Sequence, residues 1–373
     1  MKRFLNRANT FILLVIYAIS LLFGGTKANF DTLKCYTGAD IDAEAAEALS
    51  KGVEVSSRLF ELFFGKGDGS DDAVMLYPGG SVFGLVINED GATVTEAPGS
   101  RALLVGDRII AINGTEIDDV AQVDELVKAS GGRRMEIEVI RCGEKVTLSV
   151  TPRQENGEYT LGVRLRSRTA GIGTLTFIDP ETLVFGGLGH GVSDPSGQGR
   201  VSMRSGAATS VTLGSCKRGE IGHAGELTGI LKQSRIGTIN LTNDCGIFGT
   251  LDTLPDYCNE PIPAAARTDV KSGKAEIIST VKNGMRSSYE VEIYDIDYTS
   301  SGSKSFKIRV TDPTLISLSG GIVRGMSGSP IIQNGKLVGA VTHVMVANPT
   351  EGYGIFIENM LSAAQNQEIP KAA

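Results

Sequence analysis

The chain has 373 residues, a net charge of −7 and three histidines, and 41% of its residues are hydrophobic. An acidic chain without a basic stripe is a poor match for general nucleic-acid binding, so we expect no nucleic-acid partner. The high glycine content (47 residues), together with many short Val/Ile/Thr runs, favours a β-rich protein with many turns, long enough for two or three domains.

The first 28 residues predict export. Lys2, Arg3 and Arg7 form a basic start, and residues 11–23 are almost entirely apolar. As a helix this run spans about 20 Å, which is shorter than a hydrocarbon core of about 30 Å. The segment therefore fits a signal peptide, with Thr26-Lys27-Ala28 as a cleavage site, and an uncleaved signal anchor is the alternative. In both cases the remainder is expected on the far side of the membrane.

Residues 29–71 mix polar and apolar segments and are interpreted as a spacer. The five cysteines are Cys35, Cys142, Cys216, Cys245 and Cys258. None of them has CxxC spacing, which argues against zinc, and we expect no metal and no cofactor. Export permits disulfides, but an odd number of cysteines leaves at least one thiol without an intramolecular partner. The pairing stays open.

A compact module is predicted over residues 72–153. A glycine loop leads into a strand near residue 85, and VGDRIIAING (105–114) ends in a hairpin turn. An amphipathic helix follows at 120–130, and two strands close the module. This order resembles a PDZ domain. The resemblance implies that Ser81, Val82, Phe83 and Gly84 receive the terminal carboxylate of a peptide, which then adds to the sheet edge.

The remainder, residues 165–373, is predicted to be a second β-rich domain. Seven or more short alternating runs lie between residues 200 and 312, separated by turn residues. No long helical period interrupts them. This pattern indicates a barrel or sandwich rather than an alternating α/β sheet.

The chemical signal lies in Gly325-Met326-Ser327-Gly328-Ser329-Pro330. Glycines on both sides of a serine favour a tight, exposed turn that a substrate can approach closely. The run resembles the nucleophile loop of chymotrypsin-like proteases. That resemblance implies that the amides of Gly325 and Ser327 form an oxyanion hole. A glycine-serine loop joining two strands is the alternative interpretation.

A serine nucleophile needs a base, which is usually histidine. His190 lies between two glycines after a strand-like run and is the best candidate, with His223 second; His343 either lines a specificity pocket or packs. A carboxylate should orient the base. The candidates are Asp194, Asp244, Asp269, Asp295, Asp297 and Asp312. Spacing alone favours the region from Asp244 to Asp297.

Two blocks, AGIGTLTFIDPETLVFGGLGHGVSD (170–194) and GGIVRGMSGSPIIQNGKLVGAVTHV (320–344), closely resemble the stage IV sporulation protein B family of signalling serine peptidases. The resemblance implies a chymotrypsin-like double β-barrel behind the PDZ domain. It also implies Ser327 as the nucleophile, His190 as the base and Asp312 as the assisting carboxylate, in preference to the carboxylates that spacing favours.

The same resemblance implies a role in endospore formation. The peptidase would be exported from the forespore into the space between the two membranes, membrane-associated or secreted. It would cleave itself and then cut a regulatory subunit of a membrane-embedded processing complex, which activates a late mother-cell sigma factor. Its PDZ domain would bind first the chain itself and later the substrate. The competing hypothesis is a PDZ scaffold with an inactive β-domain that organises a membrane complex.

Overall fold

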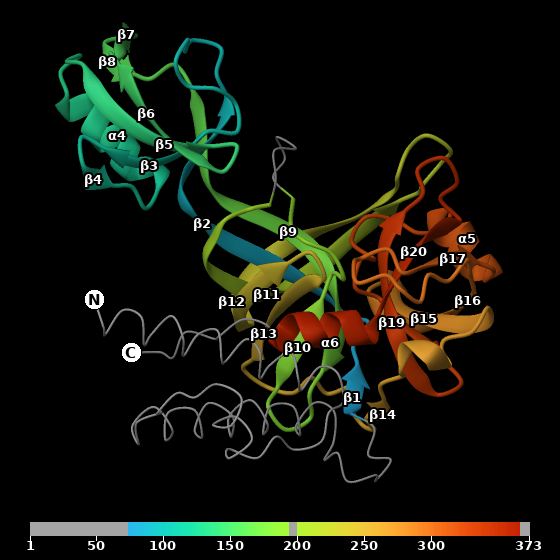
Figure 1. The fold of residues 1–373 in the computed structure, drawn as a ribbon. Helices are drawn as coiled ribbons and strands as arrows, with labels where there is room; N and C mark the ends of the chain where they lie inside the picture. Colours follow the sequence, from blue (N-terminus) through green and yellow to red (C-terminus); the bar gives the residue numbers. More distant parts are fainter. Residues whose placement is uncertain (1–73, 194–199, 366–373) are drawn as a thin grey trace, which may run out of the picture. The chain divides into compact units, whose positions relative to one another are not determined.

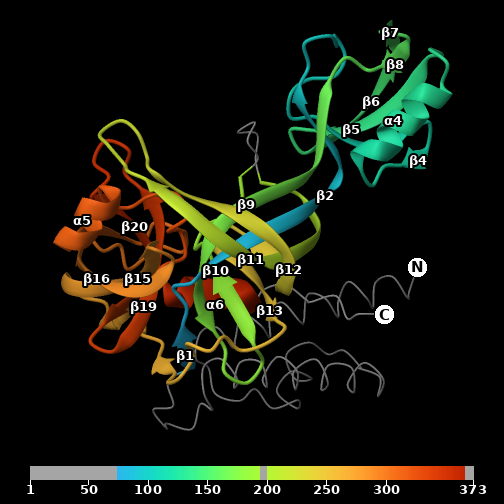
Figure 2. The same ribbon diagram turned by 180° about the vertical axis from the view of Figure 1, so that it is seen from behind.

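The computed structural model describes residues 74–193 and 200–365. The predicted signal segment (1–28), the spacer (29–71) and Asp194 lie outside the described residues. The rest is mainly strand, and Figures 1 and 2 label its elements. Among the described residues, no helix combines the length and the apolarity that a membrane crossing requires.

A first barrel is built from six strands, each paired with the next and the last with the first. In spatial order they are β2 (Val82–Glu96), β9 (Arg164–Ile178), β10 (Val184–Gly187), β13 (Gly246–Leu251), β12 (Glu226–Asn243) and β11 (Met203–Lys217). Alternating apolar residues fill its interior, with Phe83 and Phe185 in edge-to-face contact at 5.8 Å between ring centroids. The barrel also carries β1 (Met75–Pro78), which pairs with β9 and with β14 (Ile262–Pro263).

A second closed barrel follows in the sequence and is coloured orange to red in Figure 1. Its spatial order is β15 (Gly273–Lys282), β16 (Met285–Tyr294), β17 (Phe306–Val310), β20 (Glu351–Phe356), β19 (Lys336–Val344) and β18 (Pro330–Gln333). A 3-10 turn, η1 (Arg267–Asp269), precedes it, and α5 (Pro313–Ser319) lies between β17 and β18. The helix α6 (Ile357–Gln365) ends the described chain. Its Met360 and Leu361 share one buried cluster with Phe177 and Phe248 of the first barrel and Ile355 of the second.

The PDZ module is inserted in the chain between β2 and β9 of the first barrel. Its elements are β3 (Arg108–Ile112), β4 (Thr115–Glu116), α4 (Val120–Ala129), β5 (Met135–Arg141), β6 (Glu144–Val150), β7 (Arg153–Glu155) and β8 (Glu158–Thr160). It has a hydrophobic core of its own, which includes Val94, Ile109, Val123 and Ile137. Asp119 caps α4 by accepting a hydrogen bond from the Gln122 amide.

The structure confirms the predicted fold class, which is mainly β with two barrels and a PDZ module. It differs from the sequence-based division into 72–153 and 165–373. Residues 82–88 of β2 pair with β9 on one side, and residues 84–89 pair with β11 on the other. The first part of the predicted PDZ segment therefore belongs to the peptidase barrel. One 15-residue strand serves both units. Within it, Asp90-Gly91 (Gly91 φ +92°) lies at a register shift between Asn88 and Thr93, where the pairing with β9 passes from the barrel to the PDZ module.

Candidate active site

Ser327 lies in the loop that leads into β18 of the second barrel. Residues of the first barrel form hydrogen bonds to this loop. Three of the loop's carbonyl oxygens accept hydrogen bonds from β9: Gly325 from the Thr174 hydroxyl (2.8 Å), Ser327 from the Thr174 amide (2.9 Å) and Gly328 from the Thr176 hydroxyl (2.8 Å). Both threonines are fully buried. Buried polar groups are costly unless they are paired, so these bonds fix the course of the loop.

Glycine at position 328 follows from the close contact between the two barrels. The residue has φ +94°, and a Cβ there would lie 2.0 Å from the Thr174 carbonyl oxygen and 2.5 Å from the Leu188 amide nitrogen. No side chain fits this place. The loop after Ser327 thus lies directly against the segment that leads to His190.

The two amides that the sequence assigns to an oxyanion hole have no acceptor. Neither the Gly325 nor the Ser327 N–H forms a hydrogen bond within the described part of the chain. The next amides along the loop are used, because Gly328 donates to Val341 (2.7 Å) and Ser329 donates to Met326 (2.9 Å). Gly325 and Ser327 are half-buried. The two open donors therefore suit a negatively charged oxygen that arrives with the substrate.

His190 follows β10 in a turn with two left-handed residues, Leu188 (φ 64°) and Gly189 (φ 68°). Its Nδ1 lies 2.8 Å from the carbonyl oxygen of Gly191. A carbonyl can only accept, so Nδ1 carries the proton and Nε2 carries the lone pair. This is the tautomer that a general base requires. Burial lowers the pKa of His190, and the bond to Gly191 opposes this shift in part.

Ser327 and His190 meet at two consecutive residues of β19. The Ser327 hydroxyl donates to the Thr342 carbonyl oxygen (2.8 Å), and the His190 ring lies 4.8 Å from the His343 ring, between centroids. A register shift between Val341 and His343 interrupts the pairing of β19 with β20 at this point. Such bulges re-aim backbone groups next to active sites. The structure gives no direct hydrogen bond between Ser327 and His190 in the described residues.

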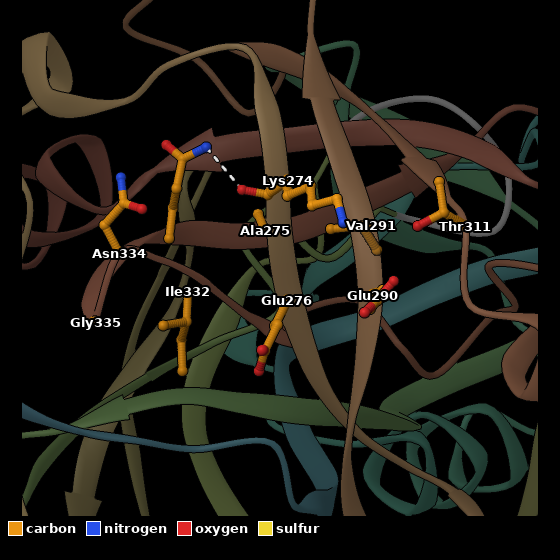
Figure 3. Close-up of a pocket in the computed structure, with 10 residues that line it drawn as sticks. Lys274, Ala275, Glu276, Glu290, Val291, Thr311, Ile332, Asn334 and Gly335 are labelled. Carbon is orange, nitrogen blue, oxygen red and sulfur yellow. Dashed lines mark hydrogen bonds between the residues drawn. The ribbon is translucent and has the colours of Figure 1, made fainter.

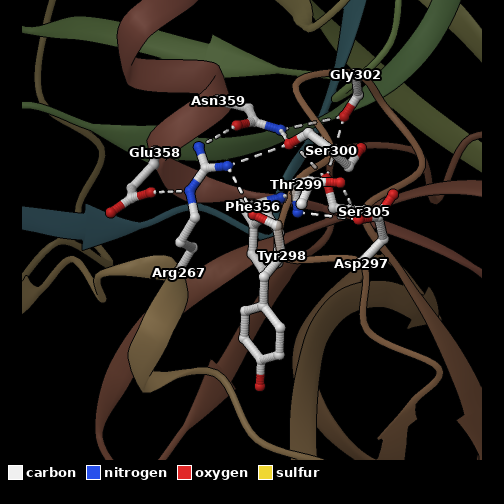
Figure 4. Close-up of polar contacts among 10 residues, drawn as sticks. All are labelled: Arg267, Asp297, Tyr298, Thr299, Ser300, Gly302, Ser305, Phe356, Glu358 and Asn359. Atoms are coloured by element: carbon white, nitrogen blue, oxygen red, sulfur yellow. Dashed lines mark hydrogen bonds and ion pairs between the residues drawn. The ribbon is translucent and has the colours of Figure 1, made fainter.

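A polar cluster supports the other side of Thr342. The Thr342 hydroxyl donates to the carbonyl of Ser303 (2.8 Å) in the loop before β17. Arg267 fixes this loop to α6, because its guanidinium contacts Glu358 (2.6 Å), Asn359 (2.9 Å) and the carbonyls of Tyr298 and Ser300. Figure 4 shows these groups converging on one guanidinium. Thr342 is therefore fixed from both sides.

Asp312 has hydrogen-bond partners other than His190 in this structure. It is the N-cap of α5, where Oδ1 accepts from the Leu315 amide (2.9 Å) and Oδ2 from the Glu290 amide (3.4 Å). No hydrogen bond or ion pair joins it to His190 in residues 74–193 and 200–365. The structure brings Ser327 and His190 to one place but does not bring Asp312 there. The assignment of Asp312 as the orienting carboxylate stays a prediction.

The remaining candidates have other partners. Asp269 pairs with Lys336, Asp295 with Lys307, and Asp297 with Thr299. Asp244 pairs with Arg200, whose side chain lies beside Gly191, the residue after His190. His223 lies in an exposed turn, where its backbone exchanges hydrogen bonds with Glu220. An open hollow of about 360 Å³ on the second barrel is lined by Lys274, Glu276, Glu290, Thr311 and others (Figure 3). None of the three predicted catalytic residues lines this hollow.

The predicted carboxylate loop of the PDZ module needs correction. Ser81, Val82, Phe83 and Gly84 do not form an open loop. The last three belong to β2 in the first barrel, and the Phe83 side chain is fully buried there. The Ser81 carbonyl accepts from the Leu175 amide (3.0 Å). With β9 on one side of this strand and β11 on the other, no peptide can add to it.

The structure offers another edge for a peptide. Arg164 and Leu165 of β9 pair with β2 on one side, and among the described residues no strand pairs with these two on the other side. The strand β9 also contacts α4. Just before this edge, the amides of Leu161 and Val163 have no acceptor in the part of the chain that the structure describes. The sequence reasoning missed this loop. Its signal was the apolar-Gly-apolar run Leu161-Gly162-Val163 that leads into a strand.

Comparisons with known proteins agree with this description. Residues 92–141 match the PDZ domain family model. A curated relative from Lactococcus lactis, described as a putative zinc metalloprotease, is 34% identical over 102 residues, which are 26% of this chain and 24% of that protein. The chain therefore spans about a quarter of this relative's length.

Solved structures of the Rv3671c protease from M. tuberculosis are more distant. The active form has 14% identity and a TM-score of 0.33, over 54% of this chain and 76% of that one. An inactive form has 13% identity and a TM-score of 0.30, over 52% and 82%. The family model described as SpoIVB peptidase S55 matches residues 157–361. This match covers more than half of the chain, including both Ser327 and His190, and the chain therefore belongs to the SpoIVB peptidase S55 family of serine peptidases.

Proposed function

We propose that this chain is an exported endopeptidase of endospore formation in which Ser327 is the nucleophile and His190 the general base. The observation that supports this proposal is that the Ser327 hydroxyl and the His190 ring contact consecutive residues of β19, Thr342 and His343, while the amides of Gly325 and Ser327 have no acceptor among the described residues. Attack by Ser327 on a peptide carbonyl would transfer the hydroxyl proton to Nε2 of His190. The amides of Gly325 and Ser327 would then stabilise the oxyanion.

The proposal includes the biological role that membership of the family implies. The peptidase acts between the forespore and mother-cell membranes, cleaves itself, and cuts a regulatory subunit of a membrane-embedded processing complex. A late mother-cell sigma factor then becomes active. The PDZ module, with the start of β9 at Arg164 and Leu165 as its peptide-binding edge, binds the chain itself before cleavage and the substrate afterwards.

Ser327→Ala tests the nucleophile, and the chain offers a matched control in the same loop. Ser329 is fully buried, and its hydroxyl has no hydrogen-bond partner in the described residues. Ser329→Ala therefore removes a hydroxyl without breaking a bond. We expect Ser327→Ala to reduce self-cleavage on the order of 10⁶-fold and Ser329→Ala to leave it nearly unchanged. Self-cleavage is measured by mass spectrometry of the products. Equal rates for Ser327→Ala and the parent would refute the assignment.

Asp312→Asn tests the third residue. Asparagine caps a helix about as well as aspartate, so α5 should keep its start. A fall in kcat of up to about 10⁴-fold, by analogy with other triads, supports an orienting role for Asp312. In that case the Asp312 carboxylate must move to reach His190 during the reaction. Unchanged kcat assigns Asp312 to helix capping alone.

One observation favours the scaffold alternative: the Ser327 hydroxyl donates to Thr342 rather than to His190. A fluorophosphonate probe separates the two hypotheses. The peptidase becomes modified at Ser327 and Ser327→Ala does not, whereas a scaffold without activity gives no modification of either protein.

A further inference from the structure

The turn that joins β11 to β12 (residues 218–225) forms hydrogen bonds to the chain immediately before the Ser327 loop, at Ser319 and Arg324. In this turn, Gly219 donates to the Ser319 carbonyl (2.8 Å) and Gly225 accepts from the Arg324 amide (2.9 Å). Just after it, the Leu227 amide donates to the Arg324 carbonyl (2.8 Å). The turn belongs to the first barrel and the segment it grips belongs to the second. Figure 2 shows the long β11–β12 hairpin reaching the second barrel.

The bond from Leu227 concerns the peptide group that supplies one oxyanion donor. The Arg324 carbonyl and the Gly325 N–H belong to one planar peptide unit, in which the two groups point in opposite directions. When Leu227 holds the oxygen, it also sets the direction of the Gly325 N–H. Gly325 has φ +95°, and glycine tolerates many backbone conformations. The orientation therefore depends on an external partner.

The second donor is held in another way. The Ser327 N–H shares its peptide unit with the Met326 carbonyl, which accepts from the Ser329 amide (2.9 Å) inside the same loop. One half of the oxyanion hole is thus fixed by the loop itself and the other half by the opposite barrel. The Leu227 side chain is almost fully buried and lies beside Gly325.

We propose that the backbone amide of Leu227 is a positioning group for the peptidase reaction. It holds the Arg324–Gly325 peptide with its N–H available to the oxyanion, and the β11–β12 turn thereby sets the catalytic competence of the second barrel. This inference rests on the proposed function of Ser327. It differs from a packing role because only the hydrogen-bond donor matters, not the size of the side chain.

The test compares Leu227→Pro, which has no N–H, with Leu227→Ala, which keeps the N–H and loses most of the side chain. The measurement is the rate of Ser327 modification by a fluorophosphonate at several concentrations. This separates the maximal rate constant from the half-saturating concentration. We expect Leu227→Pro to lower the maximal rate constant by about 10²-fold, the effect of one lost oxyanion donor, with the half-saturating concentration unchanged. Leu227→Ala should stay within a few-fold of the parent.

A second variant acts without touching Leu227 and decides the question if Leu227→Pro does not fold. A Cβ on Gly225 would lie 2.4 Å from the Lys217 carbonyl oxygen and 2.5 Å from the Gly219 amide nitrogen, so Gly225→Ala must displace the turn. Ile230→Ala is the matched control, because Ile230 is an exposed residue of β12, the strand that follows this turn. We expect Gly225→Ala to lose maximal rate and Ile230→Ala to keep it.

The outcomes are distinguishable. Equal maximal rates for folded Leu227→Pro and Leu227→Ala overturn the positioning role and leave the peptidase assignment intact. If Leu227→Pro is not recovered folded, a parental rate in Gly225→Ala overturns it in the same way. A parent protein that the probe does not modify at all overturns the proposed function, and this inference with it.

Discussion

The imidazole rings of His190 and His343 lie 4.8 Å apart between centroids, at an interplanar angle of 38°. Burial lowers the pKa of both rings, and that of His343 falls to about 4 because His190 and Lys304 add to the effect of burial. Both side chains are therefore neutral at pH 7. A neutral His190 with a free Nε2 is ready to accept a proton, so this arrangement favours general-base catalysis over electrostatic stabilisation.

The first prediction concerns the pH profile of the reaction. Because the pKa of His190 lies below the ordinary value of 6.5, the base stays deprotonated in mildly acidic solution. We expect the acid limb of fluorophosphonate modification to be centred below pH 6.5. An acid limb centred above pH 6.5 would contradict this assignment of the base.

The second prediction concerns His343→Ala. Removing the neighbouring ring exposes His190 to water, which weakens the desolvation that lowers its pKa. The acid limb of the pH profile should move to higher pH. His223→Ala serves as the control, since that residue lies in an exposed turn, and its profile should coincide with the parent's. An unchanged limb in His343→Ala would show that the ring contact does not affect the base.

The third prediction concerns stability. His343 binds a proton in the unfolded chain near pH 6.5 but in the folded chain only near pH 4. Between these values the unfolded state holds more protons, so the free energy of unfolding should fall as the pH drops from about 6.5 to about 4. Urea titrations across this range measure the slope. His343→Phe, which cannot titrate, should flatten it, and a slope equal to the parent's would contradict the assignment.

The fourth prediction concerns the threonines of β9. Thr174→Val and Thr176→Val each leave a loop carbonyl without its hydroxyl donor, which should cost about 1–3 kcal/mol of stability. Thr174 holds Gly325 and Thr176 holds Gly328. Of the two glycines held by these hydroxyls, Gly325 supplies a proposed oxyanion donor and Gly328 does not. Thr174→Val should therefore slow fluorophosphonate modification more than Thr176→Val does. The reverse order would show that the loop is fixed mainly through Gly328.

The fifth prediction concerns the PDZ module. Val163→Pro removes an amide that has no acceptor among the described residues, in the loop before Arg164 and Leu165 of β9. Binding of a peptide with a free terminal carboxylate, measured by fluorescence anisotropy, should weaken at least tenfold. Ser81→Ala should bind like the parent, because Ser81 lies beside the barrel strand. Weaker binding by Ser81→Ala alone would restore the original position of the loop.

Local chemistry made much of the fold and the serine loop predictable. The alternating short runs indicate barrel strands, and the glycines around Ser327 mark a turn whose geometry only glycine permits at position 328. His190 was identifiable because so few histidines compete with it. These inferences depend on residue types within a few positions of each other.

What the sequence did not reveal depends on long-range pairing. The strand β2 continues from the barrel into the PDZ module through Asp90-Gly91, a pair that is typical of turns. Phe83 was predicted to lie in the PDZ loop but lies in the barrel, because its strand pairs with β9 and β11, which are distant in sequence. The β11–β12 turn contacts Arg324, which lies about a hundred positions further along the chain. The residue types in the turn do not predict this contact. The cap at Asp312 uses a residue type common to caps and catalytic sites, so the sequence does not separate the two roles.

The insertion of the PDZ module between β2 and β9 has a consequence for biosynthesis. During translation the first barrel cannot close until the ribosome has released the whole inserted segment, because β9 pairs with a strand made before it. The peptidase is thus kept incomplete until its binding module has been synthesised.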